Sequence, residues 1–265
     1  MFNPNELILE KIRAVEEYDP ATDELVGRYT QIESPSLQTS TDAADVTDAM
    51  GTPIHTFYRN SQGTFSFTNS LHSLDLMATQ FGGEKQVADA DSKILVPVSE
   101  TITIASDATV TLKYKPAGTK GSEVKYVKLI NASNTFGDTY TVSAADASGK
   151  TFTLDAETKK ITLSQGTTGR VFVSYVRESD AAVKISKSTN ALPPVRKLVI
   201  HAIFHDPCDA NIVYAGIIQC PRAQIDPTSV EVGLASDSKQ AASYKLKKAY
   251  CDESATLFDV IVAEE

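Results

Sequence analysis

The sequence contains no tryptophan, and among its 265 residues there are only three cysteines and four histidines. Cys208, Cys220 and Cys251 form no CxxC pair, and the histidines are scattered along the chain. A zinc site needs ligands at short, regular spacings, so we expect no bound metal ion. Three thiols without a pairing pattern are typical of a protein from a reducing compartment.

Recognisable catalytic motifs are also missing. The sequence has no GxSxG motif, no HExxH motif and no glycine-rich phosphate-binding loop. Asp and Glu are numerous, but none stands in a motif that would make it a general acid or base. We therefore expect that the protein is not an enzyme and has neither catalytic residues nor a cofactor.

Long apolar runs are absent as well. No stretch approaches the roughly 20 apolar residues that a membrane-spanning helix needs, and residues 1–13 carry charges within their apolar run, unlike a signal peptide. The formal net charge of −9 disfavours nonspecific binding to nucleic acid, because such binding depends on Lys and Arg neutralising phosphates. An acidic surface also keeps proteins soluble, so we expect a soluble protein made in a cytoplasm, without membrane contact.

What the sequence does contain is β-strand patterns in three parts. Two β-rich blocks, residues 1–92 and 186–265, flank a Thr- and Val-rich middle of residues 93–185. The middle has about seven short strand patterns separated by turn residues, which is typical of an antiparallel sandwich. We predict that it is an inserted, independently folded immunoglobulin-like β-sandwich, in which residues 150–155 and 159–164 form a hairpin.

The first block predicts two hairpins. Residues 6–18 and 25–33 have strand patterns on either side of a segment rich in turn residues. Residues 54–59 and 64–70 are separated by a second turn, and the later run alternates Phe with Thr and Ser, as a half-buried strand does.

One short helix is predicted after these hairpins. Apolar residues recur there at three- and four-residue steps up to Phe81, which indicates a helix with one buried face. Asn69 and Ser70 are candidates for its N-cap. Gly82 and Gly83 follow it, as expected for a C-terminus that needs a positive φ.

The segment 34–53 lacks any sustained periodicity. It is polar, small and acidic, and such long loops within a compact domain are either functional or disordered. We predict a loop, and two alternatives remain open: a solvated surface loop, or a loop that becomes ordered against a partner.

The last block predicts five strands. Residues 198–206 and 212–220 are apolar on both faces, so we expect burial on both sides, either within a large internal sheet or against a neighbouring subunit. Three further strands are predicted at residues 229–235, 241–251 and 256–264.

The order of these elements resembles a known family. It is similar to that of the tail tube (major tail) proteins of long-tailed double-stranded DNA bacteriophages. The order is a hairpin, a long polar loop, a second hairpin, a short helix ending at Phe81-Gly82-Gly83, and a β-rich C-terminal meander. The stretch GTFSFTNSLHSLDLMATQFGG, residues 63–83, carries much of the resemblance. It implies a mainly β fold: a tail-tube-type β-sandwich/barrel subunit with one short helix, plus the inserted immunoglobulin-like domain.

The resemblance also implies a function. Such subunits self-assemble into stacked, hexameric rings that form the tail tube of the virion, a conduit for DNA ejection, and are assembled in the host cytoplasm. Implied partners are other copies of the chain and other tail proteins such as the tape measure, tail tip and terminator, while DNA passes without specific binding. A loop early in the chain reaches the adjacent ring, and its candidate contact residues here are Thr39, Asp42, Asp45, Val46, Asp48 and Met50.

Two other classes remain as alternatives. A capsid decoration or head–tail joining protein shares the self-assembling profile without catalysis, and ring or tube formation by the purified protein would separate the two. A carbohydrate-binding or adhesive β-sandwich protein is the other alternative, although the absence of Trp, a common sugar-stacking residue, weighs against it.

Overall fold

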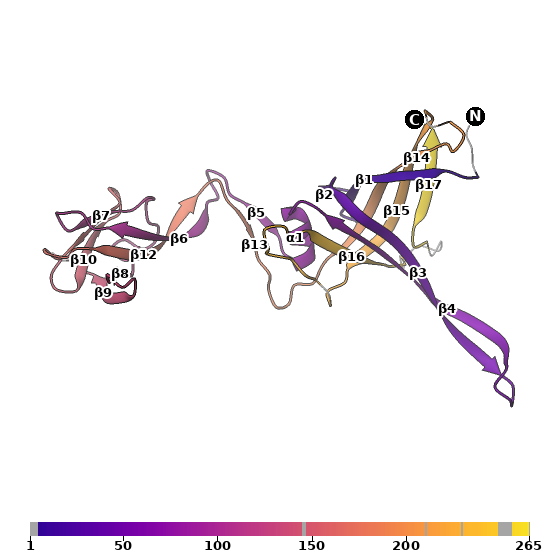
Figure 1. The fold of residues 1–265 in the computed structure, drawn as a ribbon, viewed down its shortest axis with the longest axis horizontal. Coiled ribbons are helices and arrows are strands. Elements are labelled where there is room, and N and C mark those ends of the chain that lie inside the picture. The colour runs from indigo at the N-terminus through magenta and orange to yellow at the C-terminus, as the bar shows by residue number, and fades with distance from the viewer. Residues whose placement is uncertain (1–4, 145–146, 210, 229, 249–255, 265) are drawn as a thin grey trace. The chain divides into compact units, whose positions relative to one another are not determined.

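The computed structural model describes residues 5–144, 147–209, 211–228, 230–248 and 256–264. Within these ranges the protein is mainly β with a single short helix (Figure 1), which confirms the predicted fold class. The chain separates into two compact units. We call Met1–Lys85 with Ile185–Glu265 unit 1, and Gln86–Lys184 unit 2.

The unit boundaries lie at Lys85/Gln86 and Lys184/Ile185, a few residues from the predicted positions at 92/93 and 185/186. A short two-stranded sheet of β5 (Lys85–Val87) and β13 (Val183–Ile185) forms where the chain passes between the units. Independent folding of unit 2 stays a prediction.

Unit 1 is built on an eight-stranded sheet whose pairs are all antiparallel. The strand order is β2-β1-β14-β15-β16-β4-β3, and β17 pairs with β15 beside β16. The strands are β1 Ile8–Tyr18, β2 Leu25–Tyr29, β3 Ile32–Thr47, β4 Pro53–Asn69, β14 Val195–His205, β15 Val213–Ile225, β16 Gln240–Leu246 and β17 Asp259–Glu264.

The core of unit 1 lies on one face of this sheet. Alternate residues of β14, such as Leu198 and Ile200, are fully buried there, together with Phe67 of β4 and Tyr244 of β16, whose rings stack at 6.2 Å. The opposite face of β14 and β15 is only half-buried. Burial on both faces is therefore not found within the described chain, and burial against a neighbouring subunit stays a prediction.

The helix α1 (Leu74–Phe81) confirms the predicted C-terminus but corrects the N-cap. Gly82 is left-handed, with φ +65°, and a Cβ there would lie 2.2 Å from the carbonyl oxygen of Leu192. The N-cap is Ser73, whose Oγ accepts a hydrogen bond from the N–H of Leu76. Asn69 cannot serve because it still belongs to β4.

The predicted hairpin of residues 54–59 and 64–70 is wrong, because both runs belong to the single strand β4. Asn60 has φ +60° and lies at a register shift between β3 and β4, as in a β-bulge. The chain does not reverse there, and β4 continues on both sides of it. The partner of β4 is β3, which contains most of the segment 34–53 that we expected to be a loop. The predicted strand at 229–235 is also wrong, since residues 230–235 are irregular.

Unit 2 contains seven strands around a core of its own. They are β6 Ile94–Thr103, β7 Thr109–Thr111, β8 Tyr126–Ile130, β9 Phe136–Val142, β10 Thr151–Asp155, β11 Lys160–Leu163 and β12 Arg170–Ser179, in the sheet order β6-β12-β8-β9-β10-β11-β7. The predicted β10–β11 hairpin is confirmed. The β9–β10 pair is parallel, so the expected all-antiparallel arrangement is wrong at this point. Its immunoglobulin-like character stays a prediction.

Candidate assembly interface

Within the described residues, the sheet of unit 1 has unpaired edges at its terminal strands β2 and β3, and two further ones on β1 and β17. β1 pairs with β14 along its whole length, whereas β2 covers the outer edge of β1 only from Val15 to Tyr18. β17 pairs with β15 alone. The four neighbouring strands β1, β14, β15 and β17 therefore form a sheet that is open along the first half of β1 and along β17.

The directions of these four strands alternate. Each of the pairs β1–β14, β14–β15 and β15–β17 is antiparallel, so β1 and β17 run in opposite directions. A second copy could place its β1 beside β17 and continue the same antiparallel pattern. The two open edges are thus complementary in direction.

Both open edges expose apolar side chains. Ile8 and Leu9 of β1 are 54% and 53% exposed, and Val260 and Ile261 of β17 are 56% and 48% exposed. Open strand edges invite pairing with other chains, and monomeric proteins usually protect them with charges, bulges or Pro. β17 has no Pro, and its charges stand at its two ends, so this edge has the character of an interface.

Pairs of His and Glu side chains link β1 and β14 on the side of the sheet away from the core. His201 Nε2 lies 3.0 Å from a carboxylate oxygen of Glu16, and His205 Nε2 lies 2.7 Å from one of Glu10. The hydrogen bond to His205 is the main cause that lowers the pKa of Glu10. This face therefore combines hydrogen-bonded His–Glu pairs with half-buried apolar residues of β14 and β15.

A long hairpin arm extends from the body of unit 1. In β4 every second residue from Gly63 to Asn69 is buried, whereas between Pro53 and Gln62 no residue is. The same stretch of β4 pairs with β3 from Ser40 to Thr47, so both strands leave the core together (Figure 1). Isolated two-stranded ribbons are marginally stable in water, and this arm has no buried residue of its own to stabilise it.

The six predicted contact residues all lie on this arm. Thr39 pairs with Gly63 at the base of the arm. Asp42 accepts a hydrogen bond from Asn60 Nδ2, and Asp45 accepts one from Thr56 Oγ1. In the turn at the tip, Asp48 Oδ1 accepts hydrogen bonds from the N–H groups of Met50 and Thr52. The three carboxylates thus serve the hairpin itself. Val46 and Met50, 48% and 92% exposed, remain available for contact.

Sequence reasoning missed three exposed residues on the other strand of the arm. Ile54, Phe57 and Tyr58 of β4 are 68%, 49% and 73% exposed. Phe57 shares one face of the ribbon with Val46, while Tyr58 lies on the other. The useful signal was the apolar run IHTFYR facing a polar partner strand, which leaves its side chains without a core. Apolar residues on both faces suit an arm that is covered from two sides.

Comparison with known proteins shows which family the chain belongs to. A model of the YomU/Tube protein family matches residues 7–258, nearly the whole chain and both units. The chain belongs to this family. A comparison with curated proteins finds no match. Membership confirms the predicted resemblance at the level of a phage tube-like structural protein, a component of the virion tail.

In this tube-family chain a buried carboxylate on β1 holds that strand, which carries one of the open edges, in place. Glu17 of β1 is fully buried, and it accepts hydrogen bonds from Tyr29 at 2.8 Å, from Thr79 at 3.0 Å and from Tyr244. These donors belong to β2, α1 and β16. Desolvation raises the pKa of Glu17, and the three hydroxyls oppose that rise. The cluster therefore anchors β1 to three other elements.

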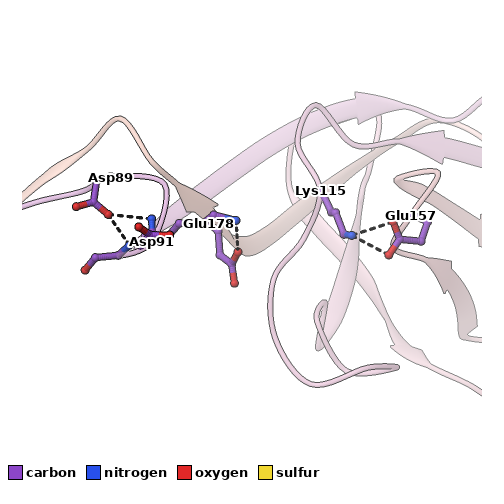
Figure 2. A network of polar contacts seen from close by, with 7 residues as sticks. Asp89, Asp91, Lys115, Glu157 and Glu178 are labelled. Carbon is purple, nitrogen blue, oxygen red and sulfur yellow. Dashed lines mark hydrogen bonds and ion pairs between the residues drawn. The ribbon is translucent and has the colours of Figure 1, made fainter.

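Unit 2 of the tube-family chain has a polar groove of about 880 Å³ between its loops. Lys115 spans it to Glu157 at 2.7 Å, and Lys93 contacts Glu178 at 3.4 Å (Figure 2). The Arg177 guanidinium lies 4.1 Å from the centre of the Tyr114 ring. These charged groups already have partners, so we interpret them as fastening the loops.

Two further findings concern the described part of this tube-family chain. No group of three or more His, Cys, Asp or Glu side chains within it is placed to hold a metal ion. None of its helices is long and apolar enough to cross a membrane, since the one helix has eight residues.

Proposed function

We propose that the protein is a non-enzymatic subunit of a phage tail tube that closes into rings by pairing β17 of one copy with β1 of the next. The single observation that carries this proposal is the open four-stranded sheet with edges of opposite direction. Such a head-to-tail contact uses two different surfaces of the subunit, and contacts of this kind close into rings when the rotation per subunit allows it. The hexameric number rests on the resemblance alone.

Charge and apolar area support the same pairing. The open part of β1 carries Glu10, Lys11 and Arg13, an excess of one positive charge, while Asp259 and Glu264 stand at the two ends of β17. Pairing would bring opposite charges to the joint and remove four exposed apolar side chains from water. Because ring closure would cover the open edges of β1 and β17, it would also remove the aggregation risk of these two edges.

The hairpin arm is proposed to connect one ring to the next. Its exposed side chains Val46, Met50, Ile54, Phe57 and Tyr58 lie on a ribbon that leaves the body of unit 1. Insertion between copies of the adjacent ring would cover both faces of the ribbon. In this proposal the rings stack through the arm, and the stacked tube meets other tail proteins, such as the tape measure, tail tip and terminator, at its ends.

Charge distribution supports a conduit for DNA. Residues 86–184 contain 12 Lys and Arg against 11 Asp and Glu, so unit 2 has a net charge of +1, and unit 1 has −10 of the total of −9. A wall of acidic subunits repels phosphates and lets a duplex slide without specific binding. The negative charge is thus concentrated in the unit that would form the wall.

Electron microscopy of the purified protein tests this function. Rings or hollow tubes are expected, and Phe57→Ser/Tyr58→Ser should give rings that no longer stack, because the arm loses its two largest exposed side chains. The double variant Leu71→Ser/Leu74→Ser is a matched control, since these exposed side chains lie next to α1, away from the arm and both edges. A protein that stays monomeric at high concentration, or one that forms closed shells, would contradict the proposal.

A further inference from the structure

Unit 2 has an exposed sheet face on β6, β12, β8 and β9, opposite its core. Residues such as Val127, Val171 and Val173 point into the core and are fully buried. Their neighbours along each strand point the other way. Cross-strand pairing aligns these outward residues in rows: Thr101, Phe172, Lys128 and Thr139 in one, and Thr103, Arg170, Ile130 and Phe136 in the next. We call this surface the aromatic face.

Aromatic rings and cations gather at the centre of the aromatic face. Phe136 is 61% exposed and meets the ring of Phe172 edge-on, with their centres 5.5 Å apart. Lys128 Nζ lies 5.6 Å from the centre of the Phe136 ring. Tyr126, one residue before the core-facing Val127, is 41% exposed. Large exposed rings on a soluble protein mark an interaction site when they are clustered rather than scattered.

Hydroxyl groups surround these rings. The register of the four strands places a set of exposed Ser and Thr side chains on the same face: Ser99, Thr101, Thr103, Thr139, Thr141 and Ser174. Each hydroxyl can both donate and accept a hydrogen bond. The face therefore offers many neutral polar groups around an apolar centre.

Two cations on this face have no carboxylate partner within the described residues. Lys128 lies over Phe136, and Arg170 donates to the side-chain oxygen of Asn134 at 2.5 Å. Two acidic side chains of these strands have partners of their own: Glu178 of β12 contacts Lys93, and Asp138 of β9 contacts Lys150. The face is thus locally cationic on a chain whose net charge is −9, which favours an anionic partner.

We propose that the aromatic face binds an acidic polysaccharide. Sugar rings present apolar C–H faces that stack on Phe136 and Tyr126, and their hydroxyls match the Ser and Thr groups. Carboxylates of the uronic acid units meet Lys128 or Arg170. A single-stranded nucleic acid is disfavoured, because its backbone needs a continuous track of several cations. The proposal goes beyond tube assembly and does not depend on it.

Binding to immobilised polygalacturonate and hyaluronate tests the proposal on the full-length protein. Dextran serves as the neutral glycan and oligo-dT as the single-stranded nucleic acid. We expect binding to at least one acidic glycan, weakened by salt, and no binding to dextran. Lys128→Gln and Phe136→Ala should each weaken it by about tenfold, the size expected for loss of one charge-assisted contact or one stacked ring.

Three control variants separate a binding role from a structural one. Phe136→Tyr should retain binding, because the ring remains. Lys120→Gln removes an exposed cation from a loop of the same unit, and Tyr58→Ala removes an exposed ring from the arm; neither should change the affinity. The proposal is overturned if neither acidic glycan binds, if dextran or oligo-dT binds as tightly, or if the two face variants bind like the unaltered protein while melting at the same temperature.

Discussion

The open edge of β17 gives a quantitative prediction for the double variant Val260→Thr/Ile261→Thr. Full burial of a Val or Ile side chain is worth about 1.5–3 kcal/mol, and these two are 56% and 48% exposed in the single subunit. Covering the exposed half of each is then worth about 1 kcal/mol, or about 2 kcal/mol for the pair. Threonine keeps the β-branched shape and the strand preference but loses most of this burial free energy. The affinity of each β17–β1 contact between subunits should therefore fall roughly 30-fold.

Sedimentation across a range of protein concentrations measures this loss as a rise in the concentration at which rings appear. Thermal unfolding of the dilute subunit should be nearly unchanged, because both side chains are already exposed there. Val87→Thr/Val183→Thr is a matched control, since these exposed residues lie on β5 and β13, away from both edges. The reasoning is refuted if the β17 variant assembles at the same concentration as the unaltered protein, or if the control fails to assemble.

Two further predictions concern the stability of unit 1. Because burial raises the pKa of Glu17 above its ordinary 4.5, its contribution to stability is complete below pH 4.5 and declines as pH rises toward the folded-state value. Glu17→Gln should remove that decline, as measured by chemical unfolding between pH 4 and 8; an unchanged pH profile would exclude the carboxylate as its cause. Gly82→Ala should lower the free energy of unfolding by about 2–4 kcal/mol, since the new Cβ meets the Leu192 carbonyl. Gly51 also has a positive φ, but a Cβ added there has no atom within 4 Å, so Gly51→Ala should lower the free energy of unfolding by only about 1 kcal/mol. Equal losses of unfolding free energy in the two variants would show that the contact with Leu192 is irrelevant.

Local sequence signals predicted the elements that make local contacts. The β1–β2 hairpin, the C-terminus of α1 at Gly82 and the β10–β11 hairpin were correctly predicted. In each case turn chemistry or a positive-φ glycine marks a reversal between neighbouring segments. These features need no knowledge of the distant chain.

The arm was missed for a physical reason. Alternation of apolar and polar residues identifies a strand only when one of its faces is buried. Between Ser40 and Thr47 neither face of β3 is buried within the subunit, so the pattern is absent although the strand is present. Residues 34–53 therefore resembled a loop, and the exposed Phe57 and Tyr58 opposite them resembled core residues.

The open edges could not be derived from the sequence either. An edge is defined by which strand lacks a neighbour, and β1 finds β14 across nearly the whole chain. Apolar residues such as Ile8 and Val260 look alike in sequence whether a strand is central or at an edge. Only the pairing order shows that they face an unoccupied side.

The β5–β13 pair has a consequence for the order in which the chain folds. β1 must find β14, and β4 must find β16, across the whole of unit 2. The entropy lost on closing a loop grows only with the logarithm of its length. The β5–β13 pair shortens the chain between Tyr18 and Val195 from about 175 to about 75 residues, which removes roughly 0.7 kcal/mol of that penalty. Within unit 2 the longest strand pair, β6–β12, joins the two ends of the unit. Folding of unit 2 would therefore bring the two segments of unit 1 that flank it close to each other and shorten the search of β1 for β14.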